Sequence, residues 1–345
     1  MKKWLFSRPI DLVVFGGTAV VALILVALMP AHDAGPYTFV AGVVLVDVAH
    51  VWSTAFIVYL DPVEWKRRSA IYAGVPVLCF VAGILLYAWG EGPFWTTIAY
   101  LAVFHFIRQQ YGWVMMYRAR NGERDRAGRW IDGAAIYLAT LYPIVWWHAR
   151  LPRAFSWMKD GDFIPGVPAW LPTVFGVAYV AALAAYLGRA AWQVATRRSI
   201  SWGKHLIVAT TAVCWYAGIV ATNSDYAFTV TNVFIHGIPY MVLVFFYARA
   251  ASGEPISRDG AAARMLAKRG ALVFVATLWL VAYVEEMLWD RTLWHDHSGL
   301  FGGGIEVGAA AIVIAPLLAV PQLTHYVLDG LLWKRARNPR LGRLL

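Results

Sequence analysis

The sequence predicts an all-α protein, a polytopic transmembrane helical bundle of about ten spans with both termini on the cytoplasmic side. Three observations predict this class: the composition, a series of long apolar runs, and the placement of lysine and arginine. Of the 345 residues, 60% are hydrophobic and only 14% are charged, which leaves too little polar surface for a soluble protein of this length. We expect residues 1–345 to form a single integral membrane domain.

The apolar runs have the length of membrane spans. A bilayer core about 30 Å thick needs roughly 20 apolar residues per helix. Backbone polar groups cannot stay unpaired in lipid, so such runs are expected to be helices rather than loops. Ten of them can be read from the sequence: 10–30, 37–60, 71–90, 93–117, 131–148, 168–190, 203–221, 226–248, 270–289 and 305–332.

The basic residues predict the orientation. With the N-terminus inside, 25 of the 30 Lys and Arg residues fall in cytoplasmic segments and four in outer loops, while Arg108 lies within a span. Such asymmetry is typical of proteins of a cytoplasmic (inner) membrane. The net charge of +10 therefore reflects topology and contact with anionic membrane lipid, and nucleic acid is excluded as a partner.

Four of the nine histidines lie deep within apolar runs: His50, His105, His236 and His325. Their four runs all cross from outside to inside. Counted at 1.5 Å per residue from the first charged residue at the cytoplasmic end, all four lie roughly 14–20 Å from that surface. The sequence therefore predicts four imidazoles in one layer near the middle of the membrane.

Each deep histidine has polar companions three or four residues away, on the same helical face. The pairs are Asp47 with His50, Gln109 with His105, Asn232 and Tyr240 with His236, and Asp329 with His325. Polar groups inside a bilayer are costly and usually functional. A metal-bound imidazole needs its second nitrogen held by a carboxylate, amide or carbonyl, and these companions can supply that support.

This pattern has three interpretations. The four histidines can bind a metal, and imidazole suits iron, copper and zinc alike. They can instead line a path for metal ions or protons, as in a transporter or channel. They can also form a purely structural polar core in an assembly protein. The common depth favours the metal site, with the other two kept as alternatives.

Arg108 lies about 15 Å from the cytoplasmic end of its run, too deep to reach the surface easily. An isolated guanidinium at that depth is costly. We therefore expect an ion pair with Asp47 or Asp329, and a substrate carboxylate or headgroup is the alternative partner.

The same segments resemble the Brp/Blh-like family of membrane β-carotene 15,15′-dioxygenases. The matching motifs are Asp47-Val-Ala-His50, Phe104-His105-Phe106, Phe234-Ile235-His236 and Val320-Pro321-Gln322-Leu323-Thr324-His325 with Leu328-Asp329. The resemblance implies iron held by histidines and O₂-dependent cleavage of a lipophilic substrate. Two positions depart from the family pattern, because Tyr240 replaces a histidine and Val51 replaces a glycine.

These patterns together predict a membrane-embedded, metal-dependent oxidoreductase, a non-haem iron oxygenase that uses O₂ on a lipophilic small molecule. The expected ligands are the four deep histidines, with His325 taking the place of the family ligand lost at Tyr240. Asp47, Gln109, Asn232 and Asp329 would orient the ligands. Tyr240 would be a ligand or a proton donor near the metal.

Overall fold

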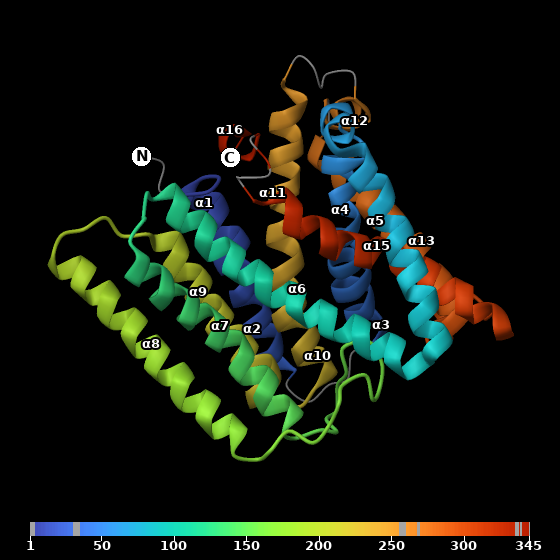
Figure 1. The fold of residues 1–345 in the computed structure, drawn as a ribbon, viewed down its shortest axis with the longest axis horizontal. Coiled ribbons are helices and arrows are strands. Elements are labelled where there is room, and N and C mark those ends of the chain that lie inside the picture. The colour runs from blue at the N-terminus through green and yellow to red at the C-terminus, as the bar shows by residue number, and fades with distance from the viewer. Residues whose placement is uncertain are drawn as a thin grey trace. The chain divides into compact units, whose positions relative to one another are not determined.

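The computed structural model describes residues 4–29, 35–254, 260–267, 270–334, 338 and 340–344. Every regular element in these ranges is helical (Figure 1). His32, one of the loop histidines, lies outside the described residues. The expectation of an all-α protein is confirmed for the described part of the chain.

Eight helical segments of the described chain are long and apolar enough to cross a membrane. They are α1–η1–α2 (Arg8–Leu28), α3–η2–α4 (Pro36–Val58), α5 (Pro62–Trp89), α8 (Leu171–Ala195), α9–η3 (Trp202–Ala221), α10–η4–α11 (Asp225–Ser252), α13–η6 (Gly270–Trp294) and η7–α15 (Gly308–Leu332). Such helices indicate a multi-pass membrane protein. The other two expected spans form α6 (Glu91–Arg120) and α7 (Arg126–His148), which are long enough but more polar.

The chain divides into two compact units. Unit 1 comprises Met1–Gly35 and Ala99–His236, and unit 2 comprises Pro36–Ile98 and Gly237–Leu345. Each unit therefore combines two segments that are distant in sequence. Two of the three boundaries fall within continuous helices, one in α6 and one in α11 (Phe234–Ser252), and the third lies between Gly35 and Pro36, where α3 begins.

Several helices contain wider, π-helical turns, which often occur at functional sites. One of them, η2 (Phe39–Val48), ends just before His50. Another, η4 (Thr229–Val233), ends just before His236, and one of its side chains bonds to the backbone of the preceding α10 (Asp225–Phe228): Thr231 Oγ1 donates to the Ala227 carbonyl at 2.7 Å. These turns determine the direction in which the side chains of the following histidines point from the helix axis.

In unit 1, α7 packs against α8 and α9 (Trp202–Trp215) (Figure 1). A buried charge cluster links α6, α7 and α9. Lys204 Nζ lies 2.6 Å from Glu123 Oε2 and 2.9 Å from Asp132 Oδ2. Arg118 contacts the same two carboxylates, at 3.2 Å from Glu123. The cluster pairs charges of both signs, so it joins helix ends without leaving an unpaired buried ion.

In unit 2, α5 packs closely along α15 (Ala311–Leu332). Gly83 permits this approach, because a Cβ there would lie 2.9 Å from Pro316 Cβ. Beyond α15 the chain returns to the same unit, where Arg340 bonds to Asp61 at 2.9 Å and to Glu254 at 2.8 Å. These contacts position α15 relative to its neighbours.

Candidate metal centre

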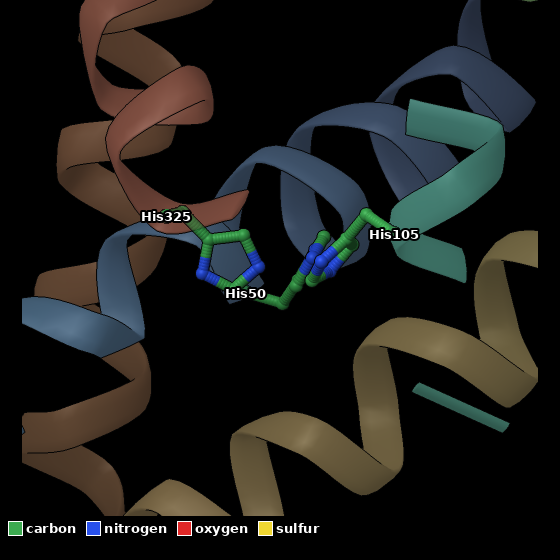
Figure 2. A group of neighbouring side chains, drawn as sticks. All are labelled: His50, His105 and His325. Carbon is green, nitrogen blue, oxygen red and sulfur yellow. The ribbon is translucent and has the colours of Figure 1, made fainter. Parts of the chain in front are cut away.

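Unit 2 brings together His50 on α4 (Ala49–Val58) and His325 on α15. Both side chains are buried, with 0% and 1% of their surface exposed. Their ring centroids are 4.9 Å apart, and the rings are nearly perpendicular. Figure 2 shows the rings of His50 and His325, and each of them offers a ring nitrogen as a possible metal ligand. His325 therefore does not point toward lipid.

Each ring in this pair has a polar side chain near its Nδ1. Asp47 Oδ1 lies 3.5 Å from His50 Nδ1, on the same helical face as the sequence predicts. Thr54 Oγ1 lies within hydrogen-bond distance of His325 Nδ1, at 2.8 Å. The bond to Thr54 orients the His325 ring and leaves its Nε2 as the nitrogen that can bind a metal.

Tyr240 lies beside the same pair, with its ring centroid 5.1 Å from that of His325. Its hydroxyl donates to Asp329 and lies 3.3 Å from Thr54 Oγ1. Asp329 also accepts a hydrogen bond from Trp333 Nε1 at 2.7 Å. The expected pairing of Asp329 with His325 Nδ1 is corrected, since Thr54 occupies that nitrogen and Asp329 holds Tyr240.

Unit 1 brings together the other two deep histidines, His105 on α6 and His236 at the start of α11. Both are buried, with 5% and 0% of their surface exposed. Their ring centroids are 5.0 Å apart with an interplanar angle of 83°. Phe106 stacks flat on His236, with centroids 3.5 Å apart. The four predicted histidines thus form two buried pairs, one within each unit.

The amide companions in unit 1 are placed differently from the prediction. Gln109 Nε2 donates to the backbone carbonyl of His236 at 2.7 Å, so it supports the partner helix instead of its own neighbour. Asn232 Nδ2 donates to the Phe228 carbonyl at 3.0 Å and to Thr231 Oγ1 at 3.1 Å. Asn232 therefore stabilises the π-helical turn before His236 and is not a partner of its ring.

The prediction of a buried ion pair for Arg108 is wrong. The side chain is exposed. Its guanidinium donates to the Tyr137 hydroxyl and lies over the Tyr111 ring, 5.0 Å from the centroid. Among the described residues its contacts are these two tyrosines and no carboxylate. The two tyrosines take the place of the expected carboxylate, and contact with a substrate or lipid headgroup stays a prediction.

The spacing of both pairs fits metal binding. Because a metal–nitrogen bond is about 2.0–2.1 Å long, the centroid of a bound imidazole lies about 3.2 Å from the ion, and two rings about 90–110° apart around it have centroids about 4.5–5.2 Å apart. The observed 4.9 Å and 5.0 Å lie within this range. Edge-to-face rings without a metal have similar spacings, so the bond between Thr54 and His325 Nδ1 is the more specific feature.

No protein-family model, curated protein or solved structure matches the chain. The family resemblance of the histidine motifs is therefore untested.

Sequence reasoning missed two residues of these surroundings, namely Thr54 and Trp333. Thr54 had a usable signal, because it lies four residues after His50 and so shares its helical face. Threonine is common in membrane helices, and this spacing alone does not distinguish it. Trp333 lies four residues after Asp329 but at the end of its helix, where aromatic residues usually mark the membrane interface.

Proposed function

We propose that this protein is a membrane-embedded, histidine-ligated metalloenzyme, a non-haem iron oxygenase that acts on a lipophilic substrate with O₂. The observation that carries the proposal is the buried pair of His50 and His325, in which Thr54 bonds to Nδ1 of His325 and the Asp47 carboxylate lies 3.5 Å from Nδ1 of His50. The common depth of the four histidines in the sequence adds His105 and His236 as further ligands. Fe(II) is the proposed metal, with copper or zinc as alternatives.

Bound iron would supply O₂ binding and one-electron chemistry, which no amino-acid side chain provides. The chain's own residues would bind the metal, orient its ligands and exclude water from them. Asp47 and Thr54 orient the two imidazoles of unit 2. Burial of both rings excludes water from the ligating nitrogens. Because the histidines lie on apolar helices, a substrate from the lipid phase can approach them, in agreement with the resemblance to the carotene-cleaving family.

We also propose ten spans with both termini in the cytoplasm, α6 and α7 supplying the two spans beyond the eight apolar ones. The distribution of lysine and arginine supports this topology. Reporter fusions after Arg68, Arg126, Arg198 and Arg340 should read as cytoplasmic, and fusions near Asp160 and Ser298 as external. A single inverted reading among these would show that the span count is wrong.

The test of the enzyme is element-resolved metal analysis of the protein purified from its own membrane. We expect about one metal ion per chain that survives purification, and O₂ consumption when a lipid extract is added. Alanine at His50, His105, His236 or His325 should each remove most of the metal. Alanine at His205, which instead bonds to Tyr186 at 2.7 Å, is the matched control and should leave it in place.

The result also separates the rival functions. Metal that exchanges freely and drives no O₂ consumption would support a transporter. Full metal content in the His50→Ala and His325→Ala variants would refute the metal centre. Loss of metal only in the variants of one pair would restrict the ligands to that unit.

A further inference from the structure

A chain of hydrogen bonds in unit 2 links His325 to a carboxylate. His325 Nδ1 lies 2.8 Å from Thr54 Oγ1, and Thr54 Oγ1 lies 3.3 Å from the Tyr240 hydroxyl. The Tyr240 hydroxyl donates to Asp329 Oδ1, which also accepts from Trp333 Nε1 at 2.7 Å. The histidine, threonine and tyrosine side chains are buried, with 1%, 4% and 1% of their surface exposed.

The carboxylate end sets the direction of every bond in this chain. Asp329 Oδ1 accepts two hydrogen bonds, so the Tyr240 proton points toward it. The Tyr240 oxygen is then the acceptor for Thr54, whose single hydroxyl proton is used in that bond. The Thr54 oxygen is left to accept from His325 Nδ1–H. This direction holds for ionised Asp329 and for Asp329 protonated at Oδ2.

We propose that Thr54 is a positioning residue, which holds His325 as the Nδ1–H tautomer and thereby presents Nε2 to the metal. The positioning role rests on the proposed function, but the Nδ1–H tautomer of His325 does not itself depend on a bound metal. Tyr240 and Asp329 act through Thr54, in that they orient its hydroxyl. Tyr240 is thus neither a ligand nor a proton donor to substrate, because its proton is given to Asp329.

The alternative is that the Thr54 side chain only fills space where α4, α11 and α15 pack together. Two variants distinguish these readings. Thr54→Val keeps the shape of the side chain and removes the hydroxyl, whereas Thr54→Ser keeps the hydroxyl and removes a methyl group. A packing role is sensitive to the methyl group, and a positioning role to the hydroxyl.

The first measurement uses metal-free protein in lipid bilayers, labelled with ¹⁵N-histidine. The His325 signals are assigned by their loss in His325→Gln. We expect protonated Nδ1 and unprotonated Nε2 in the wild type and in Thr54→Ser, and a mixture of tautomers in Thr54→Val. An Nε2–H tautomer in the wild type, or an unchanged spectrum in Thr54→Val, would overturn the proposal.

The second measurement is a titration of the same proteins with Co²⁺, followed by its visible absorption. Loss of a group that orients a ligand lowers metal affinity about 10–100-fold, so Thr54→Val should weaken binding by that factor while Thr54→Ser stays near the wild type. Equal weakening in both variants would indicate packing and overturn the positioning role. A wild-type protein that shows the expected tautomer yet binds no Co²⁺ would instead refute the proposed metal centre.

Discussion

The substitution Gly237→Ala tests how closely α11 approaches the segment that carries His50. Gly237 follows His236 and begins unit 2, facing the end of η2. A Cβ at this position would lie 2.7 Å from Val46 Cγ1 and 3.0 Å from the Val46 carbonyl oxygen. Ordinary contacts between heavy atoms are about 3.5–4.0 Å. The two segments must therefore separate by about 0.5–1 Å to admit one methyl group.

The magnitude follows from two opposed effects. Replacing a helical glycine with alanine gains about 0.8–1.0 kcal/mol of helix propensity. Overpacking a tight contact costs about 1–3 kcal/mol, and the upper half of that range applies because one of the clashing atoms is backbone. We expect a net loss of about 1–2 kcal/mol in the free energy of unfolding. The new Cβ would also lie 3.5 Å from His50 Nδ1, so metal content should fall as well.

The assay is denaturant unfolding of the purified protein in detergent, with metal analysis of the same samples. Gly74→Ala is the matched control, since Gly74 lies on α5 in the same unit with nothing within 4 Å of an added Cβ. That variant should be slightly more stable than the wild type and keep its metal. If Gly237→Ala is as stable as Gly74→Ala, the close approach of α11 to η2 is wrong.

Three further predictions concern charges in unit 1. Lys204→Met should lower the free energy of unfolding by about 3–5 kcal/mol, because it leaves Glu123 and Asp132 buried with one cation fewer; Lys334→Met, at an exposed site, should have little effect in the same assay. Arg108→Leu should lower the free energy of unfolding by at most about 1 kcal/mol, the scale of an exposed cation–π contact, and Asp47→Asn should not rescue the variant. A loss of several kcal/mol would instead support the buried ion pair. Burial acts to raise the pKa of Asp125, but the Gly128 N–H and the guanidinium groups of Arg189 and Arg118 outweigh it and hold that pKa below its ordinary 3.8. An acid with a depressed pKa stabilises the fold above its unfolded-state pKa and loses this contribution as the pH falls through the folded value. Wild-type protein should therefore be more stable than Asp125→Asn at neutral pH. The difference should shrink as the pH falls below 3.8 and vanish below the lower pKa of the folded state; a difference that persists in stronger acid would show that the charge is not its source.

The positions of the deep histidines illustrate what local sequence can predict. Apolar runs long enough for a bilayer become helices, because lipid offers the backbone no other partners. His50 and Asp47 lie one turn apart on one such run, and helical geometry alone brings them within 3.5 Å. The burial of all four histidines follows as well, since a polar ring in an apolar run is best placed away from lipid.

Contacts between helices were decided only by the tertiary structure. Gln109 was expected to serve its own helix but donates across to the carbonyl of His236. Asp329 was expected to hold His325 but holds Tyr240, while Thr54 on another helix takes the histidine nitrogen. Arg108 turns to two tyrosines on the surface.

The physical reason is the rotation of each helix about its axis. Spacing along the chain determines which residues share a face, but not which neighbour that face meets. Here the rotation also depends on π-helical turns such as η2 and η4, which shift every later side chain around the helix. The sequence by itself therefore determined an all-helical membrane protein with four buried histidines, and the packing of the helices decided which side chains hold each ring.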